Sequence, residues 1–276
     1  MSTSVGLFDV GYGAPEAAAV AKILNGGTGP YSFEHCAALT NLGPADLFGY
    51  AYSDQAFAKV LTPHLSQYDK CAILTSVPIE GNYFTRTIER VIIISTVHQA
   101  DEILIASHRT PAEYAAIAVI QELLSFEFQR TSGLAWKDLF HEHPRGCIFD
   151  FAGVKSQKVG KLIRCAICDV CLGKLSNANV DLEAVNFAKR ILHRIRRPSL
   201  ASAFRLCLTA PFLSFAYGGV VVGAAVNLLS SLALSGNGVL SHFQLGIAVG
   251  SVIAIVLFPL SVLAWLNVAE LRRRLR

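Results

Sequence analysis

The sequence predicts an α/β domain followed by a C-terminal pair of membrane-spanning helices. Three observations lead to this prediction. In the first 180 residues, β-branched apolar runs alternate with helical patterns. Cysteines and histidines cluster between residues 141 and 171. From Leu206 to Ala269 the chain has almost no ionisable side chains, and overall only 16% of the 276 residues are charged, with a mean hydropathy of +0.45.

The N-terminal part, residues 1–180, is expected to be a small α/β sandwich around one sheet, because strands that alternate with helices favour this layered fold. Thr110 and Pro111 suit the N-cap and the first position of its longest helix. We find no internal repeat in the sequence. The predicted elements are a strand at 5–10, helices at 14–24 and 54–65, strands at 71–77 and 90–96, and a helix at 111–128.

Two glycine-rich segments, GYG at 11–13 and NGGTG at 25–29, are predicted to be turns. Neither segment matches G-x-x-x-x-G-K-[ST] or G-x-G-x-x-G, the patterns in which glycine-rich loops bind the phosphates of nucleotides. The sequence therefore gives no motif-based reason to expect a nucleotide site.

Residues 205–271 are predicted to form a transmembrane hairpin, with spans at about 208–233 and 245–269. Each span has the ~20 apolar residues that a helix needs to cross the hydrocarbon core. Within the apolar stretch from Leu206 to Ala269, the ionisable side chains are Cys207, Tyr217 and His242. The bilayer is therefore the first expected partner of the chain.

The charges beside the spans predict their orientation. A basic juxtamembrane helix or linker at 181–204 precedes the hairpin and a basic tail at 272–276 follows it, whereas the connecting segment 235–244 has no Lys or Arg. By the positive-inside rule, both termini and the α/β domain are expected on the cytoplasmic side of a plasma (inner) membrane. The N-terminus lacks the basic and apolar regions of a signal peptide.

The basic run from Lys189 to Arg197 is expected to contact anionic lipid rather than nucleic acid, since it lies directly before a span. Both spans also contain glycines four residues apart, which allow helices to approach closely. These pairs are Gly219 with Gly223 and Gly246 with Gly250. They predict a homo-oligomer formed through the membrane segment, although packing within one hairpin remains the alternative.

The segment CAICDVC, residues 165–171, contains three of the seven cysteines. In a reducing cytoplasm, clustered cysteines are more often metal ligands or catalytic thiols than disulfides. An iron–sulfur motif of the bacterial type needs a further cysteine where Leu175 stands. A redox pair should open a helix after a strand, but Cys168 and Cys171 follow a basic, glycine-containing segment.

A structural zinc explains this cluster best, because FHEHPRGC upstream supplies a second half-site. Pro144 and Gly146 suit the tight turn that would bring a histidine and a cysteine to one ion. Four protein ligands would leave no position for water, so the zinc would be structural, and free buried thiols are the alternative. The candidate ligands are His141 or His143, with Cys147, Cys168 and Cys171, and with Cys165 as an alternate.

The stretches TSVPIEGNYFTR and VIIIST, a following helix and the Cys/His knuckle resemble the layout of archaemetzincin-type zinc peptidases over roughly residues 70–175. In that layout an HExxH helix precedes a structural zinc closed by C-x-x-C. Here the helix reads QELLS, so Gln121 and Ser125 replace the histidines and Glu122 is the one remaining catalytic candidate. A catalytic zinc needs about three protein ligands and a water. The resemblance therefore implies a peptidase-like fold without catalysis.

The expected function is that of a non-enzymatic sensor or effector, in which a cytoplasmic domain binds a small molecule or a protein and is coupled to the hairpin. This architecture resembles the membrane-disrupting effectors of bacterial antiviral systems. A membrane-tethered zinc peptidase and a membrane scaffold for a partner complex are the alternatives. The basic run gives only weak support for nucleic-acid binding.

Overall fold

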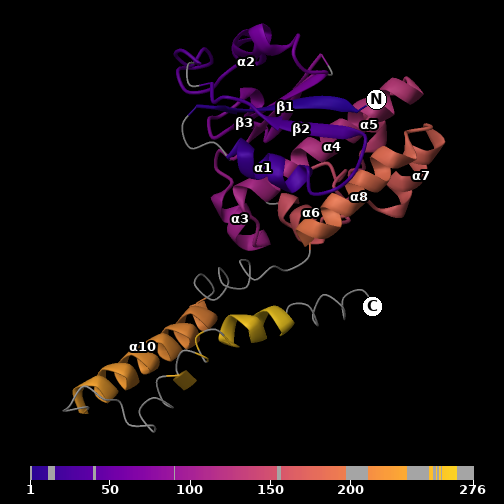
Figure 1. Cartoon of the computed structure of the whole chain (residues 1–276). Helices are drawn as coiled ribbons and strands as arrows, with labels where there is room; N and C mark the ends of the chain where they lie inside the picture. Colours follow the sequence, from indigo (N-terminus) through magenta and orange to yellow (C-terminus); the bar gives the residue numbers. More distant parts are fainter. Residues whose placement is uncertain are drawn as a thin grey trace. The chain divides into compact units, whose positions relative to one another are not determined.

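The computed structural model describes residues 2–11, 16–39, 42–89, 91–153, 157–196, 211–234, 249–250, 253, 255 and 257–265. The chain divides into two compact units, Met1–Arg196 and Arg197–Arg276 (Figure 1). The first unit confirms the predicted α/β class, with a mixed five-stranded sheet at its centre.

The strand order of the sheet is β2-β1-β3-β5-β4. Neighbouring strands are parallel except for β4, which pairs antiparallel with β5 at one edge. Helices therefore have to return the chain between the parallel strands and cover both faces of the sheet. The strands are β1 (Thr3–Val10), β2 (Tyr31–His35), β3 (Lys70–Thr75), β4 (Thr85–Ile88) and β5 (Ile92–Thr96).

The two faces of the sheet support two hydrophobic cores of different size. In β1 the side chains alternate between them, because successive residues of a strand point to opposite faces. Val5 and Leu7 belong to the larger core, which lies under α1, α4 and α8. Phe8 and Val10 belong to the smaller core, which α2 covers. The helices of the first unit are α1 (Ala17–Leu24), α2 (Asp54–Leu61), α3 (Asp101–Ser107), α4 (Pro111–Ser132), α5 (Trp136–Leu139), α6 (Lys158–Arg164), α7 (Asp169–Asn177) and α8 (Leu182–Arg196), with 3₁₀ turns at Thr62–His64 and Glu80–Asn82.

Helix α4 is the central helix of the larger core and is buried around most of its circumference. The predicted N-cap is confirmed, since the Thr110 hydroxyl accepts a hydrogen bond from the Glu113 N–H and the Glu113 carboxylate accepts one from the Thr110 N–H. The helix ends at Gly133, whose φ of 71° is a left-handed conformation that glycine adopts without strain.

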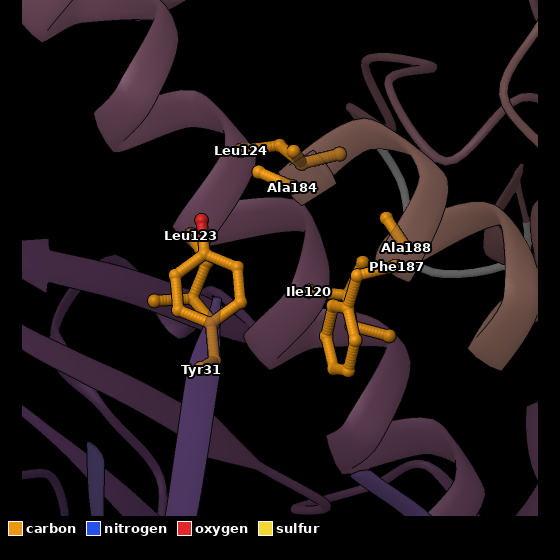
Figure 2. Close-up of a pocket in the computed structure, with 7 residues that line it drawn as sticks. All are labelled: Tyr31, Ile120, Leu123, Leu124, Ala184, Phe187 and Ala188. Carbon is orange, nitrogen blue, oxygen red and sulfur yellow. The ribbon is translucent and has the colours of Figure 1, made fainter. Parts of the chain in front are cut away.

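Helix α8 closes the larger core on the outside. Figure 2 shows the seam in which Ala184, Phe187 and Ala188 of α8 face Ile120, Leu123 and Leu124 of α4, beside Tyr31 at the start of β2. The seam is apolar and its side chains leave no room for a water molecule. It is therefore a packing contact rather than a ligand cavity.

The predicted elements differ from the observed ones mainly at their ends. The helix expected at 54–65 stops at Leu61 and continues as a 3₁₀ turn, because Pro63 has no backbone N–H to donate to the carbonyl four residues earlier. The segment NGGTG forms a turn, as predicted, whereas residues 12–13 of GYG lie outside the described residues. Strands β2 and β4 and helices α3, α5, α6 and α7 were not predicted.

The second unit contains α10 (Pro211–Leu234), a helix of 24 residues without a charged side chain. The Tyr217 ring of α10 lies 5.7 Å, centroid to centroid, from the ring of Phe258 in the helical residues 257–265. Much of the predicted second span at 245–269 lies outside the described residues. Counting only residues that the structure describes, no helix is both long and apolar enough to cross a membrane.

Candidate metal centre

Four side chains of the first unit form a compact Cys₃His cluster. The Nε2 or Nδ1 atom of His141 and the Sγ atoms of Cys147, Cys168 and Cys171 all lie within 4.8 Å of one another. His141 Nε2 is 3.4 Å from the Sγ atom of Cys168. Three thiols and one imidazole at this spacing match the ligand set and the dimensions of a tetrahedral zinc site, in which Zn–S and Zn–N bonds are about 2.3 and 2.0 Å long.

The two halves of the cluster come from a loop and from the start of a helix. His141 and Cys147 lie in the loop after α5, while Cys168 is the N-cap of α7 and Cys171 lies in its first turn. Isolated parallel bridges join His141 to Asp150 and Cys147 to Ala166, so the loop is held next to the chain that leads into α7.

Gly146 makes the turn before Cys147 possible. Its φ is 75°, and a Cβ atom there would lie 2.9 Å from the Cδ atom of Arg164. Any other residue would be strained by the conformation and would also collide with this side chain. The glycine that the sequence suggested for the turn is therefore required by the geometry.

Asp150 orients both ligands of the loop. Its Oδ1 atom lies 3.0 Å from Nδ1 of His141, and its Oδ2 atom accepts hydrogen bonds from the backbone N–H groups of Arg145 and Cys147 at 2.9 and 3.0 Å. The Asp150 side chain is buried. The hydrogen-bond partner of Nδ1 is the His143 carbonyl oxygen at 3.1 Å, while Asp150 Oδ1 has no hydrogen-bond partner among the described residues. With Nδ1 engaged in this way and the carboxylate beside it, Nε2 of His141 is directed to the thiols, the arrangement by which metal-bound histidines are commonly fixed.

The structure separates the two candidate histidines and the alternate cysteine. The side chain of His143 is exposed and outside the cluster, although its carbonyl oxygen lies 3.1 Å from Nδ1 of His141. Cys165 is buried at the end of α6, also outside the cluster, and burial raises the pKa of its thiol to about 12. The four-residue group that the structure assembles is thus His141, Cys147, Cys168 and Cys171.

The pKa values of two thiols in the cluster are shifted in opposite directions. A hydrogen bond from Cys171 lowers the pKa of Cys147, with further support from the N–H groups of Cys168 and Phe149 at 3.3 and 3.5 Å. The same contact with Cys147, together with burial, raises the pKa of Cys171. These contacts therefore favour the thiolate form of Cys147, the form in which cysteine binds metals.

Around Glu122, the described residues contain no comparable set of metal ligands. Gln121 donates a hydrogen bond from Nε2 to Oε1 of Glu122 at 2.8 Å, and Ser125 donates from Oγ to the Gln121 carbonyl at 2.9 Å. Burial raises the pKa of Glu122, and the positive charges of Lys161 and Lys158 oppose that shift. The described residues in this region thus surround Glu122 with an amide and ammonium groups rather than with imidazoles.

Lys161 is a buried residue that sequence reasoning did not identify. Its Nζ atom donates to the Asp150 carbonyl at 3.3 Å, and burial lowers its pKa to about 8. Lys161 therefore interacts both with the charge of Glu122 and with Asp150, which lies beside His141. The segment around it, KVGKLIR, is basic and gives no signal of burial in the sequence.

Comparison with family models, with curated proteins and with solved structures found no match to this chain. The resemblance to archaemetzincin-type peptidases therefore stays a hypothesis from the sequence.

Proposed function

We propose that this chain is a membrane-anchored, non-catalytic sensor or effector whose N-terminal domain is stabilised by a structural zinc. The Cys₃His cluster is the observation that carries the proposal. Four protein ligands would complete the tetrahedral shell of zinc and leave no position for a water or a substrate. Such an ion would hold α7 to the loop after α5, and the domain would act by binding a small molecule or a partner protein.

The surroundings of Glu122 support a non-catalytic role. A zinc peptidase needs imidazole ligands and a metal-bound water beside its general base. On α4, the positions next to Glu122 hold the amide of Gln121 and the hydroxyl of Ser125, and both are engaged in hydrogen bonds within the helix. A tethered peptidase is therefore the weaker candidate.

The surface of the second unit supports an anchor in the bilayer. Large apolar side chains there are exposed, among them Val222 at 62%, Leu229 at 65% and Trp265 at 63%. An apolar surface of this kind needs a lipid or protein environment. We therefore keep the proposal of a two-helix membrane hairpin with both ends in the cytoplasm, for which the basic flanks of the sequence are the argument.

The glycines of α10 support self-association in the membrane. A Cβ atom at Gly219 or Gly223 would meet nothing within 4 Å, so within the described residues no side chain packs on this face. Open small-residue faces are where membrane helices of different chains approach. An oligomer that disrupts a membrane on receiving a signal, as in antiviral defence, is the most specific form of the proposal.

Metal analysis and extraction of the full-length protein test the two parts of the proposal. We expect one zinc per chain, and we expect the protein to stay with membranes at alkaline pH, where peripheral proteins are released. Glu122→Gln should leave both properties and any membrane leakage unchanged. Two zinc ions per chain, or proteolysis that Glu122→Gln abolishes, would instead favour the peptidase. Release at alkaline pH would contradict the anchor.

A further inference from the structure

The turn between α1 and β2, residues 25–30, lies against the C-terminal half of α8 (Figure 1). Arg190 donates a hydrogen bond to the Thr28 carbonyl, and Arg194 donates one to the Gly26 carbonyl. A Cβ atom at Gly26 would overlap the Arg194 guanidinium. The glycine thus allows an arginine of α8 to lie directly on the backbone of the turn.

Gly29 likewise allows the turn to approach α8 closely, since a Cβ atom there would overlap the ring of Phe187. Phe187 is buried in the larger core, so this contact fixes the turn to α8. The glycines of NGGTG therefore serve close approach of the backbone to α8. The sequence alone did not reveal this, because the arginines are more than 160 residues away along the chain.

The turn has hydrogen-bond donors that are not used within the described part of the protein. The N–H groups of Gly27, Thr28 and Gly29 donate to no acceptor there, and neither does the Thr28 hydroxyl. Each guanidinium has five N–H donors, of which the carbonyl contacts use a small part. The ion pairs between described residues do not involve Arg190 or Arg194.

The charge around the turn is positive. Lys189 and His193 share the outer side of α8 with the two arginines, and Lys22 lies in the last turn of α1. The turn itself, α1 and residues 184–196 contain no Asp or Glu. An anion that binds at this turn would be attracted by these cations. The turn, α1 and residues 184–196 have no carboxylate that would repel it.

Buried contacts hold α8 in place, so the backbone of Arg190 and Arg194 is positioned before any ligand binds. Arg109 is buried and donates to the carbonyl of Ile195 at the end of α8, and also to that of Leu162 at 3.1 Å. The inner face of α8 is anchored in the larger core by Phe187 and Ile191. Donors that are held in place in advance lose less entropy on binding.

We propose that the turn at Gly26–Gly29, together with Arg190 and Arg194, binds a phosphate group. Guanidinium forks match the geometry of phosphate oxygens, and free backbone N–H groups add further donors. The site differs from a nucleotide-hydrolysing loop, because a strand rather than a helix follows the turn and the turn has no lysine. Binding, and no phosphoryl transfer, is what these groups support.

The phosphate can come from a lipid headgroup or from a soluble phosphate compound. The site itself is independent of the anchor, and only the lipid source rests on the proposed membrane function. In that case the site would bind the headgroup of an anionic phospholipid in the same membrane and would orient the domain on its surface.

Amide hydrogen exchange of the full-length protein tests this site. The exchange of residues 25–30 is measured in detergent with inorganic phosphate or with chloride at equal ionic strength, and in nanodiscs of phosphatidylcholine with or without phosphatidic acid. We expect exchange at Gly27–Gly29 to slow several-fold in at least one phosphate-containing arm. Slowing by inorganic phosphate alone identifies a soluble ligand, and slowing by phosphatidic acid alone identifies a lipid.

Two double variants show whether the arginines cause the effect. Arg190→Gln with Arg194→Gln should lose the slowing, whereas Lys59→Gln with Lys137→Gln removes two exposed charges on α2 and α5 and should retain it. Unchanged exchange of the wild type in every arm would overturn the proposal, and this holds even where the arginine variant does not fold. Equal slowing in the wild type and the arginine variant would overturn it as well. Zinc content and membrane retention, measured on the same preparations, report separately on the proposed function.

Discussion

At the residue scale, Cys171 and Cys165 form a natural pair for testing the metal centre, because both thiols are buried but only Cys171 belongs to the cluster. We predict that Cys171→Ala loses most of the bound zinc and lowers the thermal stability of the domain. A structural zinc contributes its binding free energy to folding, and three remaining ligands hold the ion poorly. Metal analysis by mass spectrometry and thermal melting with and without a chelator measure both effects.

Cys165→Ala is the matched control and should keep its zinc. It removes a buried thiol of the same size, so any loss of stability there reports packing rather than metal binding. If both variants keep one zinc per chain and both respond to the chelator like the wild type, the cluster is not the zinc site.

Lys161 allows a second prediction, on pH dependence. Its pKa is lowered by burial from 10.5 to about 8, so between these two values the unfolded chain binds more protons than the folded one. The free energy of unfolding should therefore rise with pH in this interval, and fall as the pH drops through it. We expect Lys161→Met to reduce that rise by about 1–3 kcal/mol.

Denaturant titrations at several pH values between 8 and 10.5 measure the slope. Lys137→Met, which changes an exposed lysine on α5, should leave the slope as it is in the wild type. A wild-type slope that equals the slope of Lys161→Met would contradict the burial of a proton-binding group at this position.

The residues of the candidate metal centre could be proposed from spacing alone, but the choice among them could not. His141 and His143 are two residues apart and equally suited by sequence. The difference arises from Asp150, which faces Nδ1 of His141 and is brought there by the turn at Gly146. Tertiary contacts of this kind cannot be predicted from the local sequence.

At the element scale, α4 is the helix on which the rest of the first unit depends. Its capping box satisfies N–H groups that would otherwise lack partners at the start of the helix. We predict that Thr110→Ala lowers the free energy of unfolding by about 1 kcal/mol, because the hydroxyl acceptor for the Glu113 N–H is lost. Chemical denaturation of the full-length protein measures the change.

Thr110→Ser is the matched control, since serine retains the hydroxyl and is an equally good N-cap. It should differ little from the wild type. Equal destabilisation by both substitutions would indicate that the lost methyl group, and not the cap, explains the effect.

The long and strongly patterned elements were predictable, and the short ones were not. Strands β1, β3 and β5 are apolar runs buried on both faces, and α4 has a clear start signal. Strand β2 has five residues with the burial pattern of an edge strand, and β4 has four that are mostly half-buried. Such short elements form because a neighbouring strand offers hydrogen bonds, which local propensity does not encode.

At the scale of the whole molecule, the two units differ in their cores. The first unit has two hydrophobic cores, although some of its large apolar side chains, among them Phe48 and Leu182, are exposed. In the second unit, large apolar side chains such as Val222, Leu229 and Trp265 are exposed. Within the second unit, Tyr217 and Val262 are buried. A Cβ atom at Gly219 or Gly223 of α10 would meet no atom of the described residues within 4 Å, which supports the proposal that this face contacts another chain.

The last prediction concerns this glycine face. Without a hydrophobic driving force between helices in lipid, association depends on close van der Waals contact, which small residues permit. Gly219→Leu with Gly223→Leu would place two bulky side chains where backbones have to approach. We expect crosslinked oligomers in membranes to decrease strongly, together with any leakage that the protein causes, while zinc content stays at the wild-type level.

Val221→Leu with Ala225→Leu is the control for this experiment, because it enlarges two exposed side chains of α10 at the same four-residue spacing. These two residues lie on the opposite side of the helix from the glycine pair, so oligomers should persist in this variant. If crosslinking in the glycine variant equals that in the wild type, α10 does not associate through this face, and the hairpin would act only as an anchor. If the control variant alone loses its oligomers, the chains meet through the opposite side of the helix.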